Sequence, residues 1–212
     1  MIYRVWQRCV GALPEKDVYV ATDDDRIRSY CESVGIQVIM TPDDCLTGTD
    51  RVYHASLKVE GDIFINVQGD EPLLEPSDIM AVVEMAQANT GSVINAMCPI
   101  LEERDFRSKT VPKVVARMDG RLLYMSRGAI PTTKGHEFVT AKKQVCIYAF
   151  PREALNDFAS RKSKTPLESI EDIEILRLLE LGYEVQMVEV SGASVAVDTP
   201  EDVSRVEALL AD

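Results

Sequence analysis

The chain has 212 residues, a formal net charge of −12 and a sequence pI near 4.7. That length suits one α/β domain with a full core, so we expect residues 1–212 to form a single domain. Non-specific nucleic-acid binding needs a basic face, and this acidic balance argues against it. No apolar run approaches the ~18 residues that span a bilayer, so we expect no membrane insertion.

Cysteine usage indicates a reducing compartment. The five cysteines are odd in number, widely spaced and without a CxxC pair: Cys9, Cys31, Cys45, Cys98 and Cys146. This pattern argues against a disulfide framework or a zinc site, and we expect a cytoplasmic location.

The first half of the chain alternates helices and strands. Apolar spacing and turn residues predict helices over 1–12, 25–34, 50–59 and 76–89, and strands over 17–21, 37–40 and 63–67. This alternation is typical of a parallel sheet with right-handed crossovers.

The second half is richer in strands. We expect them over 93–97, 112–117, 122–125, 144–150 and 184–190, and an apolar run recurs over 195–198. Helices are expected from 151 to 158, over 167–181 and from Thr199 onwards. The fold class is therefore α/β: a mostly parallel sheet with helices on both faces, part of it mixed or carrying a small β lobe.

One stretch, residues 62–73, organises these elements. Ile63–Val67 is apolar and β-branched, as a strand buried on both faces should be, and Gly69 and Pro72 end it. Gln68, Asp70 and Glu71 follow at the carboxyl end of the strand, where α/β proteins place ligands. A carboxylate there suits Mg²⁺ carrying nucleotide phosphates; the alternative is an acidic turn that faces water.

Asp198 also ends an apolar run. A parallel sheet could bring it close to Asp70, and the pair would hold Mg²⁺ against a triphosphate. The alternative is a helix start, with Thr199 as the cap and Pro200 at the first helical position.

Other polar candidates lie beside predicted elements. The turn at 47–51, which contains Gly48 and Arg51, could meet an anion or a base edge with its N–H groups. Lys113 and Arg127 flank apolar runs and could bind a phosphate or carboxylate; surface ion pairs are the alternative for both. His54 and His136 have no metal-ligand spacing.

Several motifs occur in an order that resembles one family. They are Gly-Thr-Asp-Arg (48–51), Asn-Val-Gln-Gly-Asp-Glu-Pro (66–72), Pro-Lys-Val-Val (112–115), Tyr-Met-Ser-Arg (124–127), Ile-Pro (130–131), Ile-Tyr (147–148), Leu-Glu (167–168) and Val-Asp-Thr-Pro-Glu-Asp (197–202). Over nearly its whole length the chain resembles the 3-deoxy-manno-octulosonate cytidylyltransferases, or CMP-Kdo synthetases. The resemblance implies a Rossmann-like nucleotide-binding sheet of the nucleotide-diphospho-sugar transferase type, a dimerisation lobe and a homodimer. It also implies conversion of CTP and Kdo to CMP-Kdo and pyrophosphate, for lipopolysaccharide or capsule synthesis.

The resemblance also assigns roles to residues. Asp70 and Asp198 match the two aspartates that bind Mg²⁺. Gln68, Arg51 and Gly48 match positions around the nucleotide, and Lys113 matches a basic residue of that site. Arg127, Tyr148 and Glu168 match positions near the sugar acid. The implied reaction is in-line attack of the anomeric hydroxyl on the α-phosphorus of CTP, without a covalent intermediate.

Two departures from the family carry expectations of their own. The family opens with a strand and a triphosphate-binding loop, and residues 1–9 match the helix that follows them. We therefore expect a chain truncated relative to the family, with apolar edges exposed at a central strand position. Gln144 stands where the family has a histidine near the sugar acid. Kdo is the default substrate, and an amino-Kdo or a neuraminic-type acid is the alternative substrate. The alternative to an active enzyme is an inactive nucleotide-binding homologue.

Overall fold

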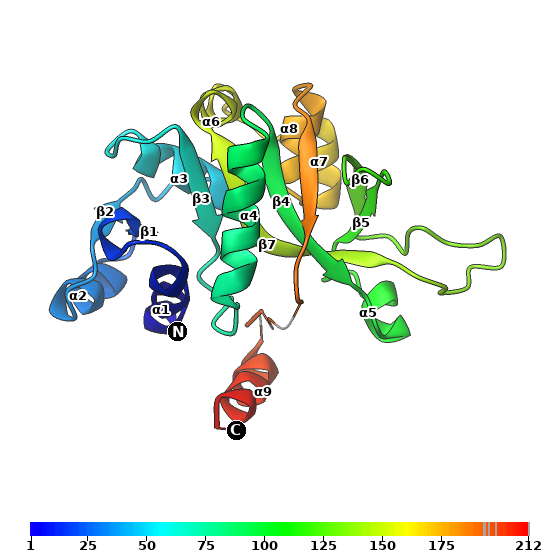
Figure 1. The fold of residues 1–212 in the computed structure, drawn as a ribbon, viewed down its shortest axis with the longest axis horizontal. Coiled ribbons are helices and arrows are strands. Elements are labelled where there is room, and N and C mark those ends of the chain that lie inside the picture. The colour runs from blue at the N-terminus through cyan, green and yellow to red at the C-terminus, as the bar shows by residue number, and fades with distance from the viewer. Residues whose placement is uncertain (193, 195, 198, 212) are drawn as a thin grey trace.

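The computed structural model describes residues 1–192, 194, 196–197 and 199–211 (Figure 1). The first half alternates as predicted: α1 (Ile2–Ala12), a 3-10 turn η1 (Glu15–Asp17), β1 (Val20–Thr22), α2 (Asp25–Ser33), β2 (Val38–Met40), α3 (Gly48–Ser56), β3 (Ile63–Val67) and α4 (Pro76–Ala88). The second half comprises β4 (Val93–Pro99), α5 (Glu103–Arg107), β5 (Lys113–Ala116), β6 (Leu122–Ser126), β7 (Lys142–Pro151), α6 (Arg152–Ala159), α7 (Pro166–Glu171), α8 (Ile175–Glu180), β8 (Val185–Glu189) and α9 (Pro200–Ala211).

The strands form two sheets. β1 and β2 pair in parallel, and a six-stranded sheet has the order β6-β5-β7-β4-β8, with β3 also paired to β7. β4 and β8 pair in parallel, whereas every pairing of β7 and β5 is antiparallel. The sheet is therefore more mixed than the sequence predicted, because β7 follows β6 through an extended arm (residues 127–141) and not through a crossover helix.

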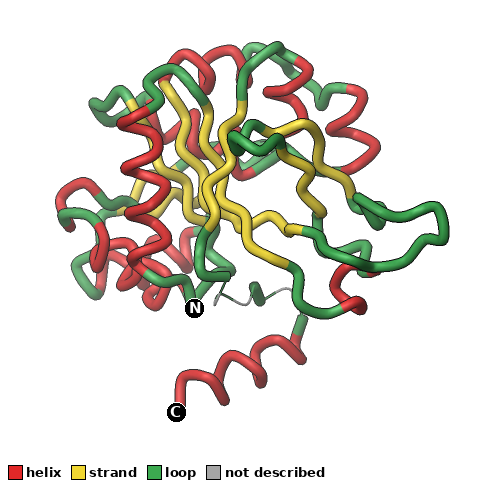
Figure 2. Tube along the Cα trace, turned by 45° about the vertical axis from the view of Figure 1, so that its right-hand side comes forward, coloured by secondary structure: helices red, strands yellow, loops and turns green. Residues whose placement is uncertain are grey.

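Helices cover both faces of the larger sheet (Figure 2). Successive side chains of β7 pack into two different hydrophobic cores, because side chains alternate between the two faces of a strand. Ile147 and Ala149 join Ile79 of α4 in one core, while Tyr148 and Phe150 join Phe158, Leu176 and Met187 in the other. No helix within the described ranges has the length and apolarity that a bilayer crossing requires.

The helix predicted over 167–181 is two helices, α7 and α8. Asp172 adopts the left-handed conformation, with φ of 52°, and ends α7. The guanidinium of Arg127 donates to the freed carbonyls of Glu171 (2.6 Å) and Asp172 (2.9 Å). A tertiary partner thus stabilises a break that local apolar periodicity does not predict.

The β5–β6 hairpin and the arm form the small β lobe (Figure 1, right). The turn of the hairpin closes against β8, where Met187 N donates to Gly120 O at 2.8 Å. Gly120 has φ of +84°, and a Cβ there would lie 2.4 Å from Gln186 Nε2 and 2.9 Å from Met187 O. Only glycine fits this close approach without displacement of β8.

β1 and β3 face one another without pairing. A cavity of about 1250 Å³ separates them and is lined by residues of α1, α3, α4 and both strands. Within the described chain, no strand pairs with either facing edge. Each of these two strands therefore has one unpaired edge within the part of the chain that the structure describes.

Candidate functional site

A second pocket, of about 940 Å³, lies at the carboxyl end of β3. Its lining includes six residues that the sequence predicted for the site: Gly48, Gln68, Asp70, Arg127, Gln144 and Tyr148. These residues come from α3, the β3–α4 turn, the end of β6 and β7. The fold thus gathers motifs that are far apart in the sequence.

Asp70 sits in the turn that ends β3. Val197 N donates to Asp70 O at 2.9 Å, so the segment after β8 reaches this turn. Asp198, the other predicted metal ligand, lies outside the described residues. Of the two residues, only Asp70 is placed by the structure, and the role of Asp198 stays a prediction.

Two buried carboxylates anchor the segment that follows β8. Asp78 accepts from Ser191 N at 3.0 Å and from Ser191 Oγ at 2.6 Å. Glu71 accepts from the Ser194 hydroxyl, and burial raises the pKa of Glu71 above its ordinary value. The serine partners of both carboxylates lie more than a hundred residues further along the chain, so local sequence patterns do not predict these contacts.

The start of α3 meets the end of β3. Thr47 Oγ1 caps Asp50 N at 3.2 Å, and Thr49 N donates to a Glu174 carboxylate oxygen at 3.0 Å. These N–H groups are already bonded within the protein, which limits the anion-binding role predicted for this turn. A Cβ on Gly48 would lie 3.4 Å from Gln68 Nε2, so glycine allows α3 to approach the amide of Gln68 closely.

Glu174 is a pocket residue that sequence reasoning missed. Its carboxylate also accepts from Gln68 Nε2 at 3.1 Å, and burial raises its pKa. Glu174 lies between Ile173 and Ile175, both buried. The sequence does contain a signal for Glu174: it is a charged residue between two apolar residues of the core. A charged residue in such a place is rarely buried without a partner.

β7, which pairs with β3, also lines the pocket. Gln144 Nε2 donates to Asn95 Oδ1 at 2.9 Å and lies 3.3 Å from Tyr148 Oη. Asn95, which no sequence motif indicates, donates to the carbonyls of Val145 (3.1 Å) and Ile147 (2.9 Å) at an irregularity in the β4–β7 register. Gln144 is therefore oriented by a buried amide.

Arg127 lines the pocket and is fixed by the chain around it. Its guanidinium donates to the carbonyls of Glu171, Asp172 and Lys109, the last at 3.0 Å. These bonds use three of the five N–H groups of an arginine, so the side chain is fixed and retains donors for an anion.

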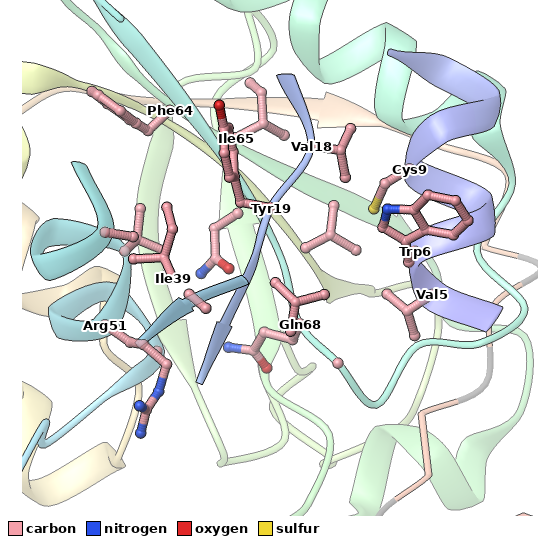
Figure 3. Close-up of a pocket in the computed structure, with 18 of the residues that line it drawn as sticks. Val5, Trp6, Cys9, Val18, Tyr19, Ile39, Arg51, Phe64, Ile65 and Gln68 are labelled. Carbon is pink, nitrogen blue, oxygen red and sulfur yellow. The ribbon is translucent and has the colours of Figure 1, made fainter. Parts of the chain in front are cut away.

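Arg51 lies on the neighbouring cavity between β1 and β3 (Figure 3). Its guanidinium donates to Thr41 Oγ1 at 2.5 Å and pairs with Asp23 at 3.3 Å. It therefore ties together the chain segments that follow β1 and β2. Gly48 and Gln68 line both cavities, whereas Arg51 lines only the one between β1 and β3.

Lys113 and Glu168 are placed differently from the sequence prediction. Lys113 is fully buried, and its ammonium donates to the carbonyls of Ser108, Val111 and Arg127, each at 2.7 Å. All three of its donors are used, and burial lowers its pKa. Glu168 is fully buried against Arg177, at 2.6 Å. Neither lines the pocket, and the hydrogen-bond partners of both are groups of the protein.

The charge of the pocket bears on metal binding. Among the described residues no cluster of three His, Cys, Asp or Glu side chains forms a metal site by itself. The pocket lining nevertheless contains more acidic than basic side chains, among them Asp70, Glu71, Asp172 and Glu174. A polyphosphate would be repelled there unless a divalent cation accompanied it, and carboxylate oxygens suit Mg²⁺.

Comparisons with known proteins identify the family. Residues 1–188 match the cytidylyltransferase family model. The 3-deoxy-manno-octulosonate cytidylyltransferase of Myxococcus xanthus is 39% identical over 212 residues, which cover 99% of this chain and 85% of that protein. The chain belongs to the 3-deoxy-manno-octulosonate cytidylyltransferase family. The member from Escherichia coli is 33% identical, over 100% of this chain and 85% of its own length.

A solved structure agrees with this assignment. A CMP:2-keto-3-deoxy-manno-octonic acid synthetase complexed with CTP superposes with a TM-score of 0.91 at 33% identity, over 99% of this chain and 87% of that one. The predicted family and the nucleotidyltransferase fold are therefore confirmed for this cytidylyltransferase. The roles of individual site residues stay predictions.

Proposed function

We propose that this cytidylyltransferase transfers CMP from CTP to 3-deoxy-manno-octulosonate and releases pyrophosphate. The observation that carries the proposal is the pocket at the end of β3, which is lined by Gln68 and Asp70 together with Gln144 and Tyr148 of β7. CTP would lie on the side of Gly48, Gln68 and Arg51, and the sugar acid on the side of Gln144, Tyr148 and Arg127.

Each side chain has a proposed role that follows from its position in the pocket. Attack of the anomeric hydroxyl on the α-phosphorus requires in-line placement, so much of the catalysis is orientation. Arg127, fixed by three carbonyls, would bind the acid's carboxylate through its remaining donors. Glu174 would hold Gln68 toward the nucleotide through the 3.1 Å hydrogen bond.

Asp70 and Asp198 are the proposed Mg²⁺ ligands. The fit rests on the hard oxygen donor of Asp70 in an acidic pocket and on the contact between Val197 N and Asp70 O. When bound, the ion would offset the negative charge of the triphosphate. Asp70 and Asp198 would position it at the carboxyl end of β3.

The identity of the acid depends on Gln144. Gln144 stands where the family has a histidine, which supports a second candidate function, activation of a related acid such as an amino-Kdo or a neuraminic-type acid. A site that hydrogen-bonds a particular substituent strongly rejects analogues that lack it.

The setting of the reaction is also a proposal. Five unpaired thiols and the absence of CxxC motifs support a cytoplasmic location. The projecting β lobe supports a homodimer, and the product would serve lipopolysaccharide or capsule synthesis.

The test is pyrophosphate release from CTP, Mg²⁺ and Kdo, with amino-Kdo and a neuraminic acid in parallel. It is run on this 212-residue chain and on one extended by the codons upstream of Met1. Turnover that requires both CTP and an acid supports the proposal, and the preferred acid decides between the two candidates. If neither form turns over any acid, the alternative of an inactive nucleotide-binding homologue is correct.

A further inference from the structure

Lys143 of β7 is a half-buried residue of the candidate-site pocket to which the proposed reaction gives no role. In the register of the sheet it lies opposite Cys98 of β4. Residues opposite one another on paired strands point to the same face, so Lys143 and Cys98 share one. The segment after β8 covers this face, since a Cβ on Gly192 would lie 2.8 Å from Cys98 Sγ. Lys143 therefore lies on the side of the pocket that this segment lines.

The charge of Lys143 acts close to the turn that follows β3. Burial raises the pKa of the Cys98 thiol, the positive charge of Lys143 opposes this shift, and the negative charge of Glu71 adds to it. Both charges therefore lie near the same thiol. Because Glu71 directly follows Asp70, the ammonium of Lys143 lies near the turn at which the metal and its phosphates are proposed to bind.

The other basic side chains of the pocket have partners or are exposed. Lys164 pairs with Asp172 at 2.5 Å, and the guanidinium of Arg127 donates to three carbonyls. Arg205 is exposed on α9. Within the part of the chain that the structure describes, no hydrogen bond or ion pair holds the ammonium of Lys143. Its three donors are therefore available to a ligand.

Lys143 and its neighbour Gln144 face opposite sides of β7. Met97, which lies opposite Gln144, packs in the core that contains Tyr148. Cys98 packs in the other core, together with residues of α4. In an in-line displacement the attacking and the leaving oxygen lie on opposite sides of the phosphorus. With the sugar acid beside Gln144, the pyrophosphate that leaves falls on the side of Lys143.

The charge of the substrate calls for such a cation. A triphosphate carries more negative charge than a single Mg²⁺ neutralises, and the pocket itself is acidic. An ammonium is a compact point charge that binds phosphate oxygens, whereas the planar fork of an arginine matches a carboxylate. Arg127 is already proposed for the carboxylate of the acid, which leaves Lys143 for the phosphates.

We propose that Lys143 binds the β- and γ-phosphates of CTP and the pyrophosphate formed from them. This inference rests on the proposed function. The ammonium offsets part of the negative charge that the triphosphate brings into an acidic pocket. It adds affinity for the two compounds that contain these phosphates and none for CMP, which lacks them.

Binding of inorganic pyrophosphate with Mg²⁺, measured by calorimetry on this chain, tests the proposal without turnover. Lys143→Met keeps most of the aliphatic stem and removes the charge, so the Kd for pyrophosphate should rise about tenfold or more. The Kd for CMP should stay within about twofold of the parental value, and Lys143→Arg should retain most of the affinity for pyrophosphate.

Lys142→Met is the matched control. Lys142 is the preceding residue on β7, is also half-buried, and pairs with Glu189 outside the pocket. Its Kd for pyrophosphate should equal that of the parent. Equal Kd values in Lys143→Met and the parent would overturn the proposal. Equal losses in the two lysine variants would also overturn it, because a general loss of positive charge would then explain the effect.

Steady-state kinetics separate a phosphate contact from a carboxylate contact. In Lys143→Met the KM for CTP should rise about tenfold or more, while the KM for the acid stays near the parental value. A rise in the KM for the acid alone would contradict the proposal, because Lys143 would then bind the carboxylate. If Lys143→Met weakens pyrophosphate binding but no form of the chain turns over any acid, the proposed function fails and the phosphate site is supported.

Discussion

Asp70 is the residue on which the proposed metal site depends most directly. Asp70→Asn keeps the side-chain shape but removes the charge, so we expect kcat/KM for CTP to fall by about 100-fold or more at fixed Mg²⁺. The melting temperature should stay close to that of the parent. Mg²⁺ titrations of pyrophosphate release provide the measurement, and near-parental rates would contradict the metal assignment.

Substitution of Gln144 tests which sugar acid the enzyme prefers. Gln144→His replaces an amide that donates to Asn95 and approaches Tyr148, so the ratio of kcat/KM values for Kdo and amino-Kdo should change by about tenfold or more. The matched control is Gln186→His, on β8 and outside the pocket. An unchanged ratio in Gln144→His would remove Gln144 from the account of specificity.

Glu174 gives a pH dependence with a definite sign. Burial raises its pKa in the folded chain, so the folded state takes up a proton at a pH where the unfolded state has not. As pH falls from 7 toward 5, the free energy of unfolding of the parent should rise relative to that of Glu174→Gln. Urea titrations across this range measure the difference, and parallel curves for the two proteins would contradict the raised pKa.

At the scale of elements, a buried ion pair joins three helices. Arg177 on α8 bonds both oxygens of Glu168 on α7, each at 2.6 Å, and lies 3.4 Å from Asp50 on α3. Arg177→Met leaves a buried carboxylate without its cation and should cost about 3–5 kcal/mol. The exposed pair of Arg107 and Glu103 on α5 is the control, and Arg107→Met should cost at most about 1 kcal/mol. Equal losses of unfolding free energy in the two variants would mean that burial of the ion pair does not determine the cost of breaking it.

The β5–β6 turn provides a second comparison between elements. Gly120→Ala should destabilise the protein by more than about 2 kcal/mol, because its Cβ would collide with β8. Gly182→Ala is the matched control: φ is +89°, but nothing lies within 4 Å of the added Cβ. It should lose only about 1 kcal/mol of backbone strain energy. Thermal unfolding of both variants distinguishes a steric cause from a conformational one.

Sequence patterns predict some of these elements correctly and others not. β3 was predicted with its observed bounds because an apolar run is closed by Gly69 and Pro72. The break between α7 and α8 was missed because Arg127, more than forty residues away, stabilises it. Lys113 was assigned to the nucleotide because its motif matches the family, yet three backbone carbonyls surround its ammonium. Local apolar periodicity predicts helices and strands. It does not predict hydrogen-bond partners that come together only in the tertiary fold.

At the scale of the whole molecule, the β1–β2 unit and the larger sheet should open separately. In this chain β1 and β2 pair only with each other, whereas β4 and β7 lie at the centre of six strands. We expect the amides of Val20 and Thr22 to exchange through openings of lower free energy than those of Ile94 and Ala149. Exchange measured against denaturant concentration checks this, and a single opening energy for both groups would contradict it.

The hydrogen bond from Val197 N to Asp70 O also has a consequence for synthesis. A ribosome adds about 5–20 residues per second, so roughly 6–25 s pass between the emergence of Asp70 and that of Val197. During that interval the nascent chain carries an acidic turn whose final contacts do not yet exist. A chain that stalls or is released before Val197 is translated would lack this contact at the candidate site.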